Sequence, residues 1–162
     1  MVNTYPEGQI QSVKGENASC IMGRLTKDVD LLDGLKQVCK QHGIEAASFQ
    51  CLGSISRIGF VQIESKEDGG LQYSPPIFVN RPAELLSGTG FIGLDAKGEL
   101  DIHYHGIYVD DTGNISGGHF LEGENPTAVT IEYVIQPIKN VQLKRGPDAY
   151  WKLPVFQFTE GG

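Results

Sequence analysis

Three of the four histidines in this 162-residue chain lie within 17 residues of one another. They are His103, His105 and His119, a His-x-His pair followed after 13 residues by the third histidine. Imidazole is a common ligand of transition metals, and three imidazoles leave one position of a tetrahedral zinc ion open to water or substrate. A water held there has a pKa of about 7 and can act as a nucleophile or base. The pattern therefore predicts an open metal site; the alternative is two strand histidines and an unrelated third.

The segments around these histidines explain how they can meet. Residues 100–109 read as a strand, in which alternate side chains share a face, so His103 and His105 point to the same side. The polar segment 110–114 predicts a turn. The strand after it carries His119 and returns beside the first strand, which predicts that all three imidazoles converge.

Carboxylates near the predicted site are candidates to orient the imidazole rings through hydrogen bonds. There are four such candidates, and the sequence does not favour one over another: Asp101, Glu99, Glu84 and Glu122. Arg24, just before the predicted helix, is a candidate to hold an anionic substrate or to form an ordinary ion pair.

A Gly-x-Gly-x-x-Gly match, formed by Gly88, Gly90 and Gly93, has the spacing of a dinucleotide-binding loop. Such a loop must precede a helix, whose N-terminus holds the pyrophosphate. Here a turn at 95–98 and another strand follow. We therefore interpret these glycines as strand positions where another group packs closely.

One segment predicts a long helix, which Asp30 can begin and Gly43 can end. Nearly all other regular segments read as strands that follow one another without helices between them. The expected strands cover residues 19–25, 44–52, 57–63, 77–80, 83–94, 99–109, 128–136 and 141–145. This pattern predicts an α+β domain with a mainly antiparallel sheet.

Length and composition indicate a single domain, which we place at residues 18–158 after an N-terminal extension at 1–17. The ends, 1–17 and 159–162, are expected to be loosely ordered.

The formal net charge of −7 disfavours a nucleic-acid binder. The odd number and wide spacing of Cys20, Cys39 and Cys51 argue against a disulfide framework. Neither a membrane span nor a signal peptide is recognisable, which predicts a cytoplasmic protein.

Several blocks together resemble the plants-and-prokaryotes-conserved (PPC) domain family. They are Asp101–His105, Gly117–Gly123, Arg24-Leu25, Asp30–Leu35, His42–Ala47, Pro82–Gly90 and Thr130–Tyr133. The likeness extends from about Cys20 to Leu153, which is most of the chain.

The resemblance implies an antiparallel sheet partly rolled around one main helix, a fold type shared with acetolactate decarboxylase. It also implies a homotrimer in which His103, His105 and His119 bind zinc. Such a protein is a candidate metalloenzyme, a lyase or hydrolase acting on an unknown small molecule. The alternative is a DNA-binding or protein-interaction module with a structural metal. The family is often labelled DNA-binding, but this chain lacks the Arg-Gly-Arg-Pro hook of plant members, which, like the acidic charge, disfavours DNA.

Overall fold

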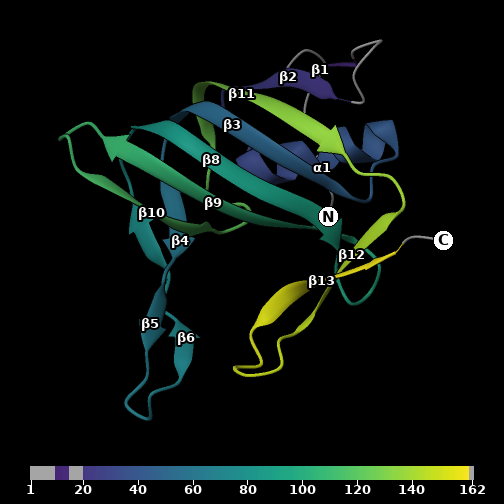
Figure 1. The fold of residues 1–162 in the computed structure, drawn as a ribbon. Coiled ribbons are helices and arrows are strands. Elements are labelled where there is room, and N and C mark those ends of the chain that lie inside the picture. The colour runs from purple at the N-terminus through teal and green to yellow at the C-terminus, as the bar shows by residue number, and fades with distance from the viewer. Residues whose placement is uncertain (1–9, 15–19, 161–162) are drawn as a thin grey trace.

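The computed structural model describes residues 10–14 and 20–160, in which one helix and thirteen strands are found. Figure 1 shows a broad sheet with the helix α1 (Leu31–His42) against one face. The strands are β1 (Ile10–Lys14), β2 (Ile21–Thr26), β3 (Ala47–Ile55), β4 (Ile58–Val61), β5 (Ile63–Ser65), β6 (Leu71–Tyr73), β7 (Ile77–Val79), β8 (Ala83–Leu94), β9 (Leu100–Asp110), β10 (Ile115–Phe120), β11 (Thr127–Pro137), β12 (Val141–Pro147) and β13 (Pro154–Glu160).

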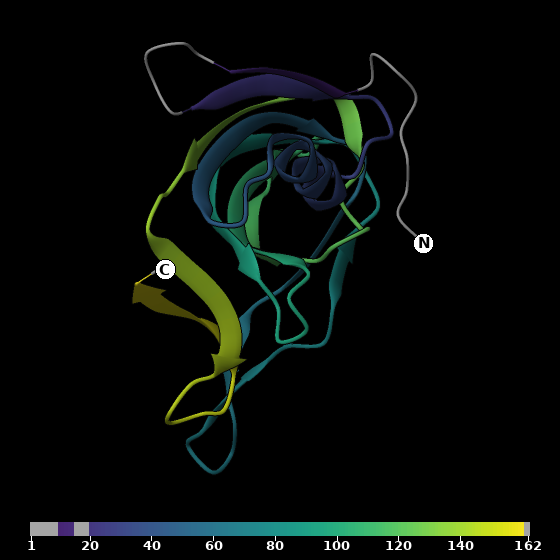
Figure 2. The ribbon, with the colours of Figure 1, turned by 90° about the vertical axis from the view of Figure 1, so that its right-hand side faces the viewer.

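The main sheet has the strand order β1-β2-β11-β3-β8-β9-β10-β4-β7. Its pairings are antiparallel, apart from a single parallel contact of β12 with β8. In Figure 2 the helix is seen end-on and the strands curve around it. The predicted class, α+β with a mainly antiparallel sheet and one helix, is therefore confirmed.

Helix α1 forms where its capping residues predict. The Asp30 carboxylate accepts hydrogen bonds from the backbone amides of Leu32 and Asp33, and Gly43 ends the helix with a φ of 63°. This left-handed conformation suits glycine, which has no Cβ to clash with the backbone. Apolar side chains at helical spacing then bury one side of α1 against the sheet.

A buried polar cluster, which we call the helix-start cluster, joins the beginning of α1 to the segment that connects β10 and β11. It consists of Asp30, Asn125 and Thr127. The backbone amide of Asn125 donates to Asp30 Oδ2 at 2.8 Å, and Thr127 Oγ1 donates to the carbonyl of Val29 at 2.8 Å. The side-chain amide of Asn125 bonds to Gly59 in β4 and to the carbonyl of Leu121, just after β10. The cluster thus fixes the end of β10 relative to the helix.

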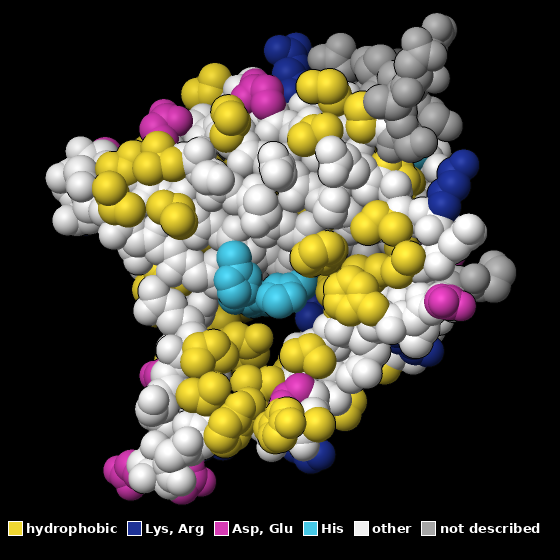
Figure 3. Space-filling model, in the orientation of Figure 1, with side chains coloured by type: hydrophobic (Ala, Val, Ile, Leu, Met, Phe, Trp, Pro, Cys, Tyr) yellow, Lys and Arg dark blue, Asp and Glu magenta, His cyan; other side chains and the backbone are white. Residues whose placement is uncertain are grey.

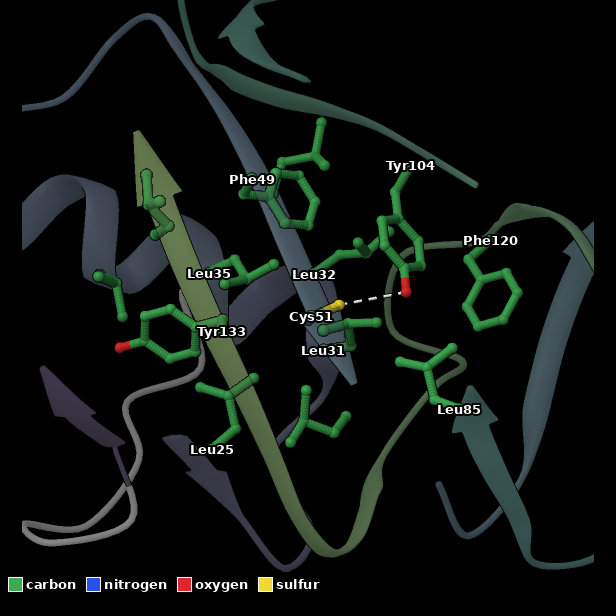
Figure 4. Close-up of a cluster of buried hydrophobic side chains, with 14 of the residues drawn as sticks. Leu25, Leu31, Leu32, Leu35, Phe49, Cys51, Leu85, Tyr104, Phe120 and Tyr133 are labelled. Carbon is green, nitrogen blue, oxygen red and sulfur yellow. Dashed lines mark hydrogen bonds between the residues drawn. The ribbon is translucent and has the colours of Figure 1, made fainter. Parts of the chain in front are cut away.

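Tyr104 of β9 is fully buried and packs in the core on the inner face of the sheet. Its ring stacks on Phe49 at a centroid distance of 5.4 Å, and its hydroxyl lies 3.2 Å from Cys51 Sγ (Figure 4). A Cβ at Gly88 would lie 1.7 Å from the Tyr104 hydroxyl, so this position has no room for a side chain. The glycine-rich segment therefore lies within strand β8, where close packing requires glycine as predicted.

Some predicted elements differ in the structure. The expected strand 57–63 is interrupted at Gln62, whose backbone bonds to Ser74 instead and starts a separate hairpin, β5–β6. Strands β1, β6 and β13 were not predicted: β6 is very short, and β13 depends on pairing with β12. Residues 10–14 and 159–160, within the ends expected to be loosely ordered, form parts of strands β1 and β13, whereas 1–9, 15–17 and 161–162 lie outside the described residues.

Two hairpins extend from the same side of the sheet, β5–β6 and β12–β13 (Figure 1). Phe91 of β8 packs edge-on against Phe158 of β13, with ring centroids 5.8 Å apart, which attaches the second hairpin to the sheet.

The cysteines Cys20, Cys39 and Cys51 are free, as predicted. Within residues 10–14 and 20–160 no helix has the length and hydrophobicity needed to cross a membrane.

Candidate metal centre

His103, His105 and His119 meet on the outer face of the sheet, as their spacing predicts. One ring nitrogen from each lies within 4.8 Å of the other two. The Nε2 atoms of His103 and His105 are 3.1 Å apart. Two imidazoles bound to one tetrahedral ion at about 2.0–2.1 Å would place their nitrogens ~3.3 Å apart. His103 and His105 are therefore spaced as two ligands of one ion would be, and His119 lies close enough to join them.

The strands set this arrangement through their register. His105 of β9 lies directly opposite His119 of β10, and His103 lies two residues away on the same face. Buried Tyr104, between the two β9 histidines, fixes which face of the strand points outward. On β10, a Cβ at Gly118 would lie 2.5 Å from the Val61 carbonyl of β4, so glycine there lets the strands approach closely.

The three imidazoles are held in their neutral form, in which a nitrogen lone pair is free for a metal. The pKa of His103 and that of His119 are both lowered from 6.5 to about 4. Burial is the largest cause, followed by repulsion from the neighbouring histidines and Arg145, while Asp101 partly opposes the shift. Burial also lowers the pKa of His105.

His119 also has a buried ring nitrogen, Nδ1, that lacks a hydrogen-bond partner among the described residues, as a metal ligand would in the absence of its ion. A buried polar nitrogen left in this state costs about 1–3 kcal/mol of stability. A metal ion bound at this atom would satisfy it, so the residues present are well suited to a metal.

Aromatic rings from the two hairpins lie beside the histidines. Tyr73 of β6 is 5.7 Å from the ring of His119, and Phe156 of β13 is 6.4 Å from the ring of His103. Figure 3 shows the histidines at the edge of a hollow, with hydrophobic side chains gathered below and beside them. A pocket of about 370 Å³ lies on the sheet next to His103 and His105, with Phe91 and Thr89 in its lining. This volume is in the range of small-molecule sites.

Arg145 of β12 lies near the histidines, and no sequence motif marked it as part of the site. Its Nε donates to Asp101 Oδ2 at 2.6 Å, and its guanidinium lies 4.1 Å from the centroid of the Phe156 ring. The two charged side chains are largely buried, with exposed fractions of 15% and 25%. Only the pairing of β12 with β8 and β13 brings Arg145 to the strand of His103.

The four candidate carboxylates behave differently from one another. Asp101 lies near the histidines but pairs with Arg145. Glu122 pairs with Lys36 of α1, while Glu84 and Glu99 are exposed. In the part of the chain that the structure describes, no hydrogen bond joins any of the four to an imidazole.

Arg24 is not part of the site. It lies on β2, and strands β11, β3 and β8 separate it from β9. Its opposite residue on β11 is Glu132. The suggestion that Arg24 faces the histidines and holds an anion is therefore wrong.

Comparison with known proteins agrees with this architecture. The model of the Plants and Prokaryotes Conserved (PCC) domain matches residues 12–139. No curated protein matches the chain. A plant- and prokaryote-conserved protein from Pyrococcus horikoshii is 21% identical, with a TM-score of 0.71, covering 96% of this chain and 99% of its own.

Two further solved structures are similar in fold. A metal-containing protein from Archaeoglobus fulgidus is 19% identical, with a TM-score of 0.73, covering 93% of this chain and 98% of its own. A protein from Bacteroides thetaiotaomicron, whose description proposes DNA binding, is 16% identical, with a TM-score of 0.74 and coverage of 93% and 99%. At these identities the likeness shows the fold alone. The fold brings three histidines together at one strand pair. Because the family model matches most of the sequence, this chain belongs to the plants-and-prokaryotes-conserved domain family.

Proposed function

We propose that this protein binds one zinc ion per chain through His103, His105 and His119 and acts on a small molecule at the open coordination position. The observation that carries the proposal is the meeting of three neutral imidazoles within 4.8 Å. Among the described residues no thiol or carboxylate completes this group. Structural zinc sites are usually closed by a fourth protein ligand, commonly cysteine, whereas catalytic sites keep a position open.

A zinc ion held there would supply Lewis-acid chemistry of the kind that lyases and hydrolases use. The protein's own groups would determine what reaches it. The pocket beside His103 and His105 offers the hydroxyl of Thr89 and the ring of Phe91 to a bound molecule. Tyr73 and Phe156, beside the histidines, would limit the access of bulk water.

The first test is the metal content of the purified protein, compared with a His103→Ala/His105→Ala double variant. We expect about one zinc per chain in the parent and almost none in the variant. A parent that remains metal-free after incubation with zinc would overturn the proposal. Iron, nickel or manganese in place of zinc would keep the site and correct the metal, because imidazole binds all of them.

We further propose a homotrimer, in line with the family resemblance. Support comes from hydrophobic side chains on the outer face of the sheet: Met22, Leu52 and Leu86 are each more than half exposed and line one pocket. Exposed apolar patches of this kind commonly mark contacts between proteins. Light scattering should give three times the 17.6 kDa mass of one chain; a monomer would contradict it.

The alternative is a DNA-binding or protein-interaction module whose metal is structural. It is motivated by the description of the Bacteroides structure and disfavoured by the net charge of −7. A DNA binder should show an affinity that falls steeply with salt. A structural metal should unfold the protein on removal, because its binding free energy is then folding free energy. We expect neither result.

The likeness to acetolactate decarboxylase, including a partly rolled sheet, also stays a proposal. It concerns the fold and transfers no reaction. Superposition of an experimental structure of this chain on that enzyme would test it directly.

A further inference from the structure

We infer that Arg145 binds the anionic end of the molecule that occupies the open metal position, so that the site prefers small carboxylates to neutral molecules of the same shape. The inference deepens the proposed metal site and rests on it. It identifies a specificity-determining residue that lies outside the three histidines and comes from a different part of the chain.

The position of Arg145 is the first reason. One of its terminal nitrogens lies 3.4 Å from the carbonyl oxygen of Ile102, the residue directly before His103. Its guanidinium stacks on Phe156, the same ring that lies beside His103. The charge is therefore held next to the ligand strand by packing, with little freedom to move away. A guanidinium so fixed loses little entropy when it binds a ligand.

The hydrogen-bonding capacity of Arg145 is the second reason. A guanidinium has five N–H donors. Nε uses one on Asp101, and the terminal nitrogens make two long bonds of 3.4 Å to the backbone carbonyls of Ile102 and Pro154. Among the described residues, each terminal nitrogen thus keeps one N–H without a partner. Such an N–H can donate a charge-assisted hydrogen bond to a carboxylate oxygen.

Charge balance is the third reason. The three histidines are neutral ligands, so a divalent ion would bring its full charge into a partly buried site. Within residues 10–14 and 20–160, Asp101 is the only carboxylate that acts on His103 or His119, and Arg145 already pairs with it. The loaded site would therefore carry an uncompensated positive charge, which a bound anion would reduce. A carboxylate could do this with one oxygen on the metal and the other accepting a hydrogen bond from Arg145.

Asp101 has the opposite role in this scheme. Its carboxylate holds Arg145 through one oxygen, and its other oxygen accepts the amide of Ile102 at 2.8 Å. It competes with an incoming anion for the same guanidinium. Removing Arg145 and removing the charge of Asp101 should therefore change anion affinity in opposite directions. If the pair were only a structural bridge, both changes would break it and both would act in the same direction.

The experiment uses the full chain loaded with cobalt(II), whose visible absorption changes when its fourth ligand changes. The probes are acetate and acetamide, which have the same shape but differ in charge. We expect acetate affinity to fall at least tenfold in Arg145→Met, because charge-assisted hydrogen bonds are lost, and to rise in Asp101→Asn. The Arg145→Met/Asp101→Asn double variant, which keeps the parent's net charge, should still bind acetate more weakly than the parent. Acetamide binding should change little in any of them.

Cobalt stoichiometry and melting temperature are measured for every variant. Arg57→Met, which removes an exposed guanidinium paired with Glu124, is the matched control and should bind acetate like the parent. Equal acetate affinity in all variants, or a fall in both Arg145→Met and Asp101→Asn, would overturn the inference while the metal site stands. Failure of the parent to take up cobalt or zinc would overturn the metal site and, with it, the role of Arg145.

Discussion

The helix-start cluster and the histidine cluster are both groups of polar side chains held close together by the fold, but their hydrogen bonding differs. Asn125 and Thr127 are fully buried, and their polar side-chain atoms have backbone partners. In the histidine cluster, Nδ1 of His119 is buried without a partner. His103 and His105 contact each other through Nε2.

This difference is the one expected between a structural cluster and a metal-binding one. Buried polar groups in folded proteins are nearly always hydrogen-bonded, because leaving one unpaired is costly. The helix-start cluster follows that rule and needs nothing further. The histidine cluster departs from it at His119 Nδ1, and a metal ion bound at this atom would offset the cost. Four predictions test this contrast, in order of decreasing effect.

The largest effect is expected for Asn125→Ala. This change leaves the amide of Gly59 and the carbonyl of Leu121 without their side-chain partner in a buried place. At about 1–3 kcal/mol for each unsatisfied group, and with a cavity in addition, we expect a loss of about 3 kcal/mol or more. Urea unfolding of the metal-free protein measures it. Asn114→Ala, in an exposed turn, is the control and should cost within about 1 kcal/mol.

His119→Ala should do the reverse: it should weaken zinc binding strongly and change the stability of the metal-free protein little. Loss of a metal ligand should weaken zinc binding at least a hundredfold, more than the roughly 10–100-fold cost of losing a ligand's hydrogen-bond partner. The metal-free variant should unfold within about 1 kcal/mol of the parent, since it removes an unsatisfied nitrogen. Zinc competition with a chromophoric chelator and urea unfolding give the two values. A metal-free variant as unstable as Asn125→Ala would remove the contrast between the clusters.

The third prediction concerns pH and the metal-free protein. The folded pKa of His103 and His119 is about 4, against about 6.5 in the unfolded chain. The unfolded state therefore binds more protons between these values, and stability should fall as pH drops from 6.5 towards 4. Each group contributes less than about 1.4 kcal/mol per pH unit, reduced by solvent screening. His103→Ala/His105→Ala should have a shallower slope; an unchanged slope would contradict the lowered pKa of these imidazoles.

The smallest effect is expected at Asp33, beside the helix-start cluster. Burial, then the charges of Asp30 and Glu122, raise its pKa to about 6. Here the folded state binds the proton more tightly, so this group lowers stability as pH rises from about 4 to 6, opposite to the histidines. Asp33→Asn should raise stability at pH 7 by about 1 kcal/mol or less after screening. Glu67→Gln, in an exposed turn, should leave it unchanged; an equal gain in both would show a general charge effect.

The sequence by itself determined the local features of this protein. Alternation along β9 puts His103 and His105 on one face, because successive strand side chains point to opposite sides. The hairpin turn brings His119 opposite His105. Asp30 and Gly43 begin and end the helix, because the bonds from Leu32 and Asp33 to Asp30 and the left-handed conformation of Gly43 arise within a few residues. The fold class and the three candidate ligands were therefore predictable.

Only the tertiary structure decided what surrounds the histidines. Arg145 pairs with Asp101 across 44 residues of sequence, and no periodicity relates the two positions. Phe156 comes to His103 on β13, a strand that exists through its pairing with β12. The same holds for Glu122, which pairs with Lys36 of α1 instead of orienting an imidazole. Side-chain partners in these cases are set by how distant strands pack, whereas alternation and caps act within a few residues.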